Sequence, residues 1–245
     1  MNKKRNFKKI AFLMLIGIFL SLLSCSGITK QPVGRYIILG CDKSASNINF
    51  SENNITHGYN MCQDLLVKLT KTLRSNVDKM EFLAFDGEGD TSELELNKSS
   101  YNAKLLKEEL KKSLKIKQKG NIGTATGSFI RSVTEKIKKY HQRKSEQEIY
   151  IVINSDFFDE SLSNKRNKKT NLTNSDLVEF GKTLASIKGS KLAIVNISKQ
   201  NEDKVDLLFR YLGKNFFLAN QNHSKLESER QIVNRLLMSF NMGGI

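Results

Sequence analysis

The stretch that decides the fold is Tyr36-Ile37-Ile38-Leu39-Gly40-Cys41, followed directly by Asp42-Lys43-Ser44-Ala45-Ser46. A short apolar run without polar alternation is typical of a strand that is buried on both faces. An acidic residue and two hydroxyls follow it, each separated by one residue, at the point where such a strand emerges into a loop. Oxygen ligands of this kind suit a hard divalent cation, so the stretch predicts a buried strand that ends at a cation site.

Continuous apolar runs of this kind recur along the chain. Residues 149–153 and 192–195 are also continuously apolar, and amphipathic helical patterns separate these segments. A strand at 80–85, followed by a Gly/Asp-rich turn, returns near Leu94 as a hairpin. The pattern predicts an α/β fold: a doubly wound, mostly parallel central sheet with one antiparallel hairpin strand and helices on both faces.

The N-terminus has the pattern of an export signal. Five basic residues precede an apolar run from Ile10 to Leu20, which is too short to favour a membrane-spanning helix. The run ends in Leu22-Leu23-Ser24-Cys25, which resembles a bacterial lipobox. We therefore expect residues 1–24 to be a lipoprotein signal peptide and Cys25 to become the lipidated, palmitate-bearing first residue. An uncleaved anchor and ordinary secretion are the alternatives.

The expected organisation after Cys25 is a short tether at residues 25–33 and a single domain at residues 34–245. A lipidated chain of this kind is expected in the bacterial cell envelope. Ser26 does not resemble the acidic signal that retains many Gram-negative lipoproteins in the inner membrane, which favours the outer membrane there. In a Gram-positive host the same chain is expected on the outer face of the cell membrane.

The charge of the chain is strongly basic, with a formal net charge of +15. Without residues 1–24, the chain has 35 Lys and Arg residues against 25 Asp and Glu residues. A basic surface is compatible with anionic lipid head groups, but such charges more often form solvated helix faces. No nucleic-acid-binding motif accompanies the charge, so nucleic acid is not an expected partner.

Two cysteines remain beyond the leader, Cys41 and Cys62. Both lie within apolar patterns, where a buried free thiol is the commoner outcome. A disulfide between them is the alternative if the domain is exported to an oxidising compartment. The sequence favours two free buried cysteines.

Two predicted strands end in an aspartate, Asp42 and Asp156. In open α/β sheets, ligands bind beyond the carboxyl ends of the strands, so these carboxylates meet if their strands are neighbours. Two adjacent carboxylates repel each other unless a cation lies between them. Ser44, Ser46 and Thr124 add neutral oxygens, with Thr124 at the expected start of a helix.

These residues carry a resemblance to a known family. The patterns Asp42-x-Ser44-x-Ser46, Thr124-x-Thr126-Gly127 and Asp156 after an apolar strand resemble the metal-ion-dependent adhesion site of von Willebrand factor A-type (VWA) domains and integrin I domains. The likeness covers roughly residues 34–245, and the expected order of strands and helices agrees with that family's fold.

The resemblance implies specific roles for the matching residues. Ser44, Ser46 and Thr124 would bind a divalent cation through their hydroxyls, and Asp42 and Asp156 would do so directly or through water. Thr126 is the alternative ligand if the loop register shifts. Magnesium fits this set best, with Mn²⁺ or Ca²⁺ as alternatives. The vacant position would accept an acidic side chain of a protein partner.

The sequence departs from the family pattern at two positions. The second aspartate of the family is usually followed by glycine, whereas Phe157 follows Asp156 here, and Lys43 places a positive charge beside Asp42. Both departures predict narrower access to the cation or weaker cation binding.

Two other function classes remain open at this point. A metal-independent scaffold in envelope assembly would use the basic helical surface from Lys104 to Lys144, which contains 13 Lys and Arg residues. A metal-dependent hydrolase would use the same cation, but the sequence contains no Gly-x-Ser-x-Gly elbow and no phosphate-binding loop. The expected activity is therefore binding of a protein partner rather than catalysis.

Overall fold

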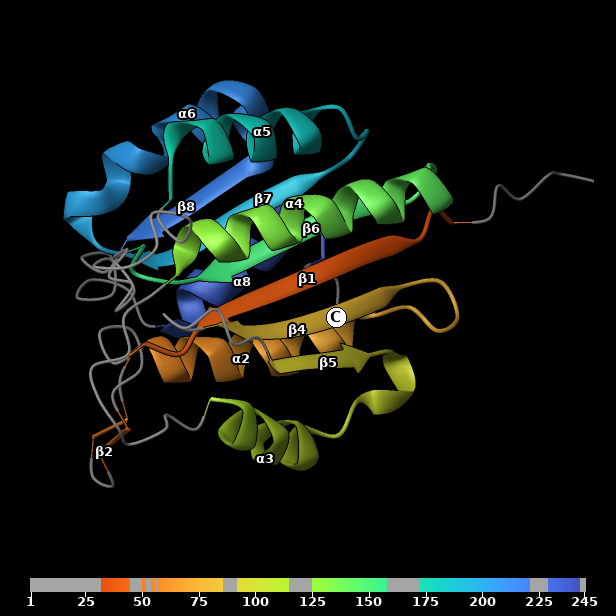
Figure 1. The fold of residues 1–245 in the computed structure, drawn as a ribbon. Helices are drawn as coiled ribbons and strands as arrows, with labels where there is room; N and C mark the ends of the chain where they lie inside the picture. The colour runs from red at the N-terminus through yellow and green to blue at the C-terminus, as the bar shows by residue number, and fades with distance from the viewer. Residues whose placement is uncertain are drawn as a thin grey trace, which may run out of the picture. The chain divides into compact units, whose positions relative to one another are not determined.

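The structure is a computed structural model, and it describes residues 32–44, 50–51, 54–55, 57–85, 92–114, 125–157, 172–220 and 229–242. The contacts divide the chain into two units, Met1–Pro32 and Val33–Ile245. The second unit is compact, and hydrophobic cores lie on both faces of its sheet. Figure 1 shows this sheet among its helices. A unit with its own core is expected to fold by itself. The expected signal peptide and Cys25 lie outside the described residues.

The core of the second unit is a six-stranded sheet with the order β5-β4-β1-β6-β7-β8. All neighbouring strands run parallel except β4 and β5, which form an antiparallel hairpin. This arrangement confirms the predicted doubly wound, mostly parallel sheet. The strands of this sheet are β1 (Arg35–Asp42), β4 (Lys79–Phe85), β5 (Ser92–Leu96), β6 (Glu148–Asn154), β7 (Lys191–Ile197) and β8 (Phe216–Asn220). A separate short pair is formed by β2 (Phe50–Ser51) and β3 (Asn54–Ile55).

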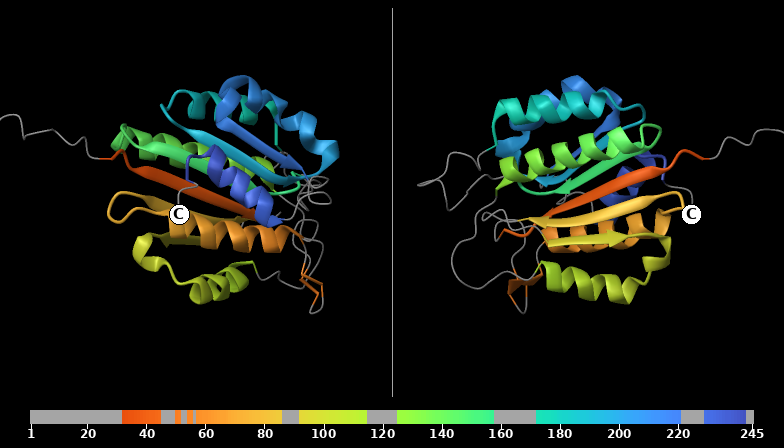
Figure 2. Two further views of the ribbon diagram at one scale, coloured as in Figure 1. Left: turned by 180° about the vertical axis from the view of Figure 1, so that it is seen from behind. Right: turned by 45° about the vertical axis from the view of Figure 1, so that its right-hand side comes forward.

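Helices cover both faces of the sheet (Figure 2), as predicted. One face packs against α2 (His57–Thr72), α3 (Ala103–Ser113) and α8 (Glu229–Ser239). The opposite face packs against α4 (Thr126–Arg143), α5 (Asn174–Ala185) and α6 (Glu202–Leu212). The single-turn 3-10 helices are η1 (Lys98–Ser100), η3 (Lys199–Asn201) and η4 (Gly213–Asn215).

The apolar runs of the central strands have the composition that two covered faces require. In β1, Ile37, Leu39 and Cys41 face the core beneath α2, whereas Tyr36 and Ile38 face the core beneath α4. Successive side chains of a strand point to opposite faces, so a strand between two helical layers needs apolar residues at every position. No described helix is long and apolar enough to cross a membrane.

Beneath the amino end of β1, a buried ion-pair cluster fixes the entry of the chain into the domain. The Asp78 carboxylate accepts hydrogen bonds from the Arg35 amide at 2.9 Å and from the Arg74 amide at 2.8 Å. Burial opposes ionisation of Asp78, but hydrogen bonds from Arg74 and Arg35 outweigh it and hold the pKa of that carboxyl well below its ordinary value. Arg35 also donates to the Thr72 carbonyl at 2.8 Å, and Arg74 donates to the Val33 carbonyl at 2.6 Å.

The prediction of free cysteines is wrong, because Cys41 and Cys62 form a disulfide. Cys41 points to the face of the sheet that α2 covers, and Cys62 lies on the buried side of that helix. Their Cα atoms are 6.4 Å apart, within the range that a disulfide spans. The bond therefore joins the end of β1, next to Asp42, to the helix that packs beneath it.

Candidate metal centre

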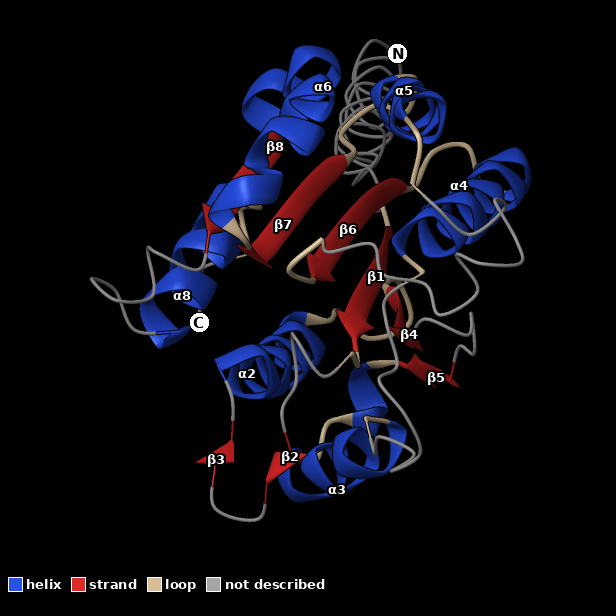
Figure 3. Cartoon of the chain, turned by 60° about the vertical axis from the view of Figure 1, so that its left-hand side comes forward, coloured by secondary structure: helices blue, strands red, loops and turns tan. Residues whose placement is uncertain are grey.

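The two aspartates singled out in the sequence lie at the same edge of the sheet. β1 ends at Asp42, and its neighbour β6 ends at Asn154, two residues before Asp156. The strands are parallel, with Cys41 paired to Asn154, so their carboxyl ends emerge together. Figure 3 shows the arrowheads of β1 and β6 side by side at this edge. Asp42 therefore lies opposite Ser155 and within electrostatic reach of Asp156.

Asp42 is held by hydrogen bonds on both carboxylate oxygens. Oδ1 accepts from the Ser44 amide at 2.9 Å, and Oδ2 accepts from the Ser155 hydroxyl at 2.8 Å. The Asp42 and Ser155 side chains are fully buried, and Ser44 is nearly so. These two hydrogen bonds fix the orientation of the carboxylate.

The environment of Asp42 opposes ionisation. Burial, and after it the negative charge of Asp156, raises the pKa of Asp42 to about 7, against hydrogen bonds from Ser44 and Ser155 that lower it. A carboxylate in this state is stabilised by any nearby positive charge. A divalent cation between Asp42 and Asp156 would neutralise their repulsion and would offset the cost of burying the Asp42 charge.

The backbone around Asp156 shows how the departure at Phe157 is accommodated. Phe157 has a φ of 58°, a conformation that glycine adopts without steric cost and a bulky residue rarely adopts. Its amide donates to the Ser155 hydroxyl at 3.0 Å, and its fully buried ring packs into the core beneath α4 and α5. The Asp156 carbonyl accepts from the Ser198 amide at 3.2 Å and from the Asn201 side chain at 3.0 Å. The ring of Phe157 is thus directed into the core, and it does not lie over the carboxyl edge of the sheet.

Thr126 supplies an unusual hydroxyl near this edge. It is the first residue of α4 and is fully buried, and its Oγ1 has no hydrogen-bond partner among the described residues. Buried hydroxyls are normally hydrogen-bonded because an unsatisfied one costs about 1–3 kcal/mol. A buried hydroxyl of this kind can serve as a neutral oxygen ligand for a cation.

Close packing places the start of α4 over the end of β1. The Phe129 ring stacks on Phe85 with centroids 3.9 Å apart. A Cβ atom at Gly40 would lie 2.2 Å from the tip of the Phe129 ring, so only glycine permits this approach. The first turn of α4, with Thr126, is therefore fixed near the residues that lead into Asp42.

The predicted site residues divide into two groups. The structure brings Asp42, Ser44 and Asp156 to the same edge, whereas Ser46 and Thr124 lie outside the described residues. The expected helix start at Thr124 is wrong, because α4 begins at Thr126 with Ala125 as a cap that makes no side-chain hydrogen bond. Ser155, which binds Asp42, was missed; only the register of β1 against β6 reveals it.

The donor set fits a hard cation that retains water. Within the described ranges, no three His, Cys, Asp or Glu side chains gather closely enough to bind a metal by themselves. The edge instead combines two carboxylates with serine and threonine hydroxyls, which suits Mg²⁺, since it binds through one or two carboxylates and keeps several waters. Asp42, Ser44, Thr126 and Asp156 are the described residues suited to hold it, and the ion would supply a positive charge able to accept an acidic ligand.

The basic segment from Lys104 to Lys144 is partly neutralised within the domain. Lys112 pairs with Glu109 at 2.7 Å, and Lys136 pairs with Glu81 at 3.0 Å. Lys138 pairs with Glu135 at 3.1 Å. The Lys112–Glu109 and Lys138–Glu135 pairs are typical of a solvated helix face, whereas Glu81 is a buried residue of β4.

No protein-family model matches the sequence, and no curated protein matches it either. Among solved structures, the SpRpn10 VWA domain is similar at a TM-score of 0.50 and 12% identity, with 83% of this chain and 95% of that chain covered.

Two further structures come from bacteria. An aerotolerance-related membrane protein from Bacteroides fragilis has a TM-score of 0.50 and 15% identity, with 85% of this chain and 98% of that chain covered. The PilB minor pilin from Streptococcus sanguinis has a TM-score of 0.52 and 10% identity, with 87% of this chain covered. The chain spans only 63% of the pilin's length. At these identities the likeness shows the fold, which is VWA-like.

Proposed function

We propose that this chain is a lipid-anchored module of the bacterial cell envelope that binds a protein partner through a divalent cation. The cation is held at the carboxyl edge of the sheet by Asp42, Ser44, Ser46, Thr124 and Asp156, with Thr126 as an additional or alternative ligand. The cation is Mg²⁺, or Mn²⁺ or Ca²⁺ in its place. Its open coordination position accepts an acidic side chain of the partner.

One observation carries this proposal: a buried carboxylate whose ionisation is opposed by a second carboxylate. Asp42 has no solvent exposure and is subject to the negative charge of Asp156. A buried carboxylate beside a second carboxylate is costly, and a cation between the two offsets that cost. The buried hydroxyl of Thr126, without a partner among the described residues, independently supports an oxygen-ligand site.

The disulfide supports the proposed location. Cys41 and Cys62 are both fully buried and joined, and structural disulfides persist in oxidising compartments rather than in the cytosol. This agrees with export by residues 1–24 and lipidation at Cys25. Cell fractionation of the full chain tests the anchor: Cys25→Ser is expected to move the protein out of the membrane fraction, and its retention there would contradict lipidation.

Partner binding is tested by capture from envelope extracts. The domain is expected to retain a partner in magnesium and to release it in chelator. Ser44→Ala is expected to abolish capture while leaving the unfolding transition intact. Ser175→Ala, on the exposed side of α5, is the matched control. Capture that is unchanged in both chelator and Ser44→Ala would remove the cation from the mechanism.

A further inference from the structure

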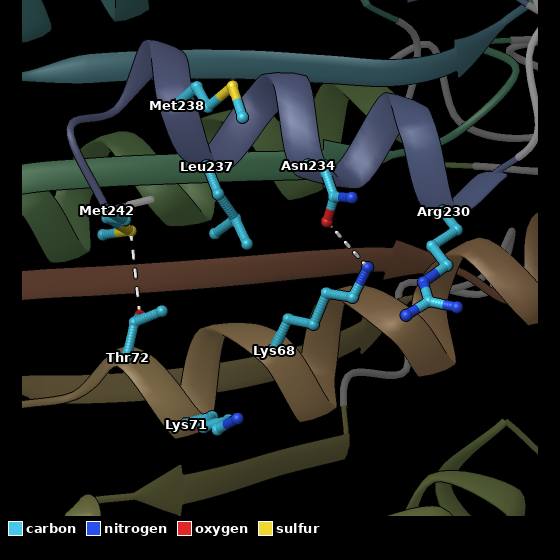
Figure 4. Close-up of a pocket in the computed structure, with 8 residues that line it drawn as sticks. All are labelled: Lys68, Lys71, Thr72, Arg230, Asn234, Leu237, Met238 and Met242. Carbon is cyan, nitrogen blue, oxygen red and sulfur yellow. Dashed lines mark hydrogen bonds between the residues drawn. The ribbon is translucent and has the colours of Figure 1, made fainter. Parts of the chain in front are cut away.

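A second candidate site lies in a groove between α2 and α8. These helices pack against each other on the same face of the sheet. The groove has a volume of about 390 Å³, which lies within the range of small-molecule sites. Figure 4 shows side chains from both helices pointing into it.

One part of the groove carries an excess of positive charge. Its cationic side chains are Lys68 and Lys71 from α2 and Arg230 from α8. Lys68 donates to the Asn234 side chain at 3.1 Å and lies 4.0 Å from the Asp64 carboxylate. No acidic side chain of the described ranges pairs with Lys71 or Arg230. Three cationic side chains and one carboxylate lie at this part of the groove, so its net charge favours the binding of an anion.

The other part of the groove is apolar. Leu237 and Met242 form a nearly buried floor, and the Thr72 hydroxyl lies 3.9 Å from the Met242 sulfur. Met238, beside them, is 66% exposed, the largest exposed fraction among the large hydrophobic residues of the described domain. Figure 4 shows Arg230 at one end of the groove and Met242 at the other. This polarity matches an amphiphile with an anionic head and an apolar tail.

The apolar end of the groove lies beside the point where the chain enters the domain. Thr72 lines the groove, and its backbone carbonyl accepts a hydrogen bond from the Arg35 side chain at the start of β1. Arg74, two residues further on, donates to the Val33 carbonyl. The metal centre lies at the other end of β1, about 25 Å away for a strand of this length. The apolar end of the groove and Val33, where the second unit begins, therefore lie at the same end of the sheet.

We propose that this groove binds an anionic phospholipid of the membrane that carries the anchor. The phosphate is held by Lys68 and Arg230, and the first acyl carbons lie against Met238 and Met242. The inference rests on the proposed anchoring at Cys25 but not on the metal. Lipid binding at this place would hold the domain in one orientation, with the carboxyl edge of the sheet exposed to a partner.

The test is vesicle binding by residues Val33–Ile245 in chelator, so that neither the anchor nor a metal contributes. The domain is expected to bind vesicles that contain phosphatidylglycerol and not vesicles of phosphatidylcholine alone. The double variant Lys68→Gln/Arg230→Gln is expected to bind about 30-fold more weakly, since each basic residue at an anionic surface contributes about 1 kcal/mol. The matched control Lys107→Gln/Lys111→Gln removes the same charge from exposed positions of α3 and is expected to lose less than about threefold.

A second variant separates the lipid from a simple anion. Met238→Gln changes an exposed side chain and leaves the fold intact. It is expected to weaken vesicle binding severalfold without changing binding of inorganic phosphate. Equal losses in the groove variant and the α3 control would overturn the proposal in favour of general electrostatic attraction. The proposal would also be overturned, in favour of an acidic protein partner, if the domain bound no vesicles but bound poly-glutamate and lost that binding when Lys68 was substituted. Neither outcome affects partner capture in magnesium or the fractionation of Cys25→Ser, so the two proposals fail separately.

Discussion

Asp42→Asn tests whether the carboxylate at the end of β1 is a destabilising charge that a cation neutralises. The side chain is fully buried, and its pKa is raised from 3.8 to about 7. Asparagine has nearly the same shape and retains an oxygen for the Ser44 amide, which donates to Oδ1 at 2.9 Å. The substitution therefore removes the charge with little change in packing.

The sign of the effect follows from proton binding. A carboxyl whose pKa is higher in the folded chain than in the unfolded chain binds more protons when folded, so stability falls as the pH rises from about 4 to about 7. Near pH 8 Asp42 is ionised in both the folded and the unfolded chain. A pKa shift of about three pH units then lowers the free energy of unfolding by at most about 4 kcal/mol. Near pH 4 this loss of unfolding free energy falls to below about 1 kcal/mol, because Asp42 is then protonated in the folded protein.

The assay is urea unfolding of residues Val33–Ile245 in chelator at both pH values. Asp42→Asn is expected to be more stable than the unsubstituted domain by a few kcal/mol near pH 8 and nearly equal to it near pH 4. Asp206→Asn, at an exposed position of α6, is expected to show no such pH dependence. Magnesium should close the gap near pH 8, because the cation stabilises only the protein that binds it. If the unsubstituted domain equals Asp42→Asn near pH 8 in chelator, the buried charge is not destabilising and the reasoning fails.

Three other substitutions test the parts that surround the site. Thr126→Val removes the buried hydroxyl. In chelator the variant is expected to be more stable by about 1 kcal/mol, and its magnesium affinity is expected to be about tenfold lower. A loss of stability in chelator would show that the hydroxyl has a hydrogen-bond partner. Gly40→Ala places a Cβ 2.2 Å from the Phe129 ring and is expected to cost about 1–3 kcal/mol in urea unfolding, and a neutral result would contradict the close approach of α4. Cys41→Ala/Cys62→Ala opens a link across 21 residues and is expected to cost about 3 kcal/mol; a reductant should then have no further effect on the variant.

The fold was predictable because the central strands carry an unambiguous pattern. Residues 37–39, 149–153 and 192–195 are apolar at every position, and only a strand covered on both faces needs that composition. The return of the chain near Leu94 was predictable from the turn residues before it. The order of the strands in the sheet is a tertiary property, and the apolar pattern does not predict it.

The site was predictable only in part. Asp42 and Asp156 stood out because aspartates at the ends of apolar strands converge at one sheet edge. Ser155 did not stand out, because its contact with Asp42 depends on the register between β1 and β6. The disulfide was missed for a similar reason: whether Cys41 meets Cys62 depends on which face of the sheet α2 covers.

The most direct test of the central claim is a calorimetric titration of residues Val33–Ile245 with magnesium near neutral pH, with Ser44→Ala as the comparison. We predict saturable binding of one cation at about millimolar concentration or below. Binding is expected to be lost in Ser44→Ala and to weaken as the pH falls below about 7, because protons then compete for Asp42. Absence of binding to the unsubstituted domain, or equal binding by Ser44→Ala, would contradict a cation site at the end of β1.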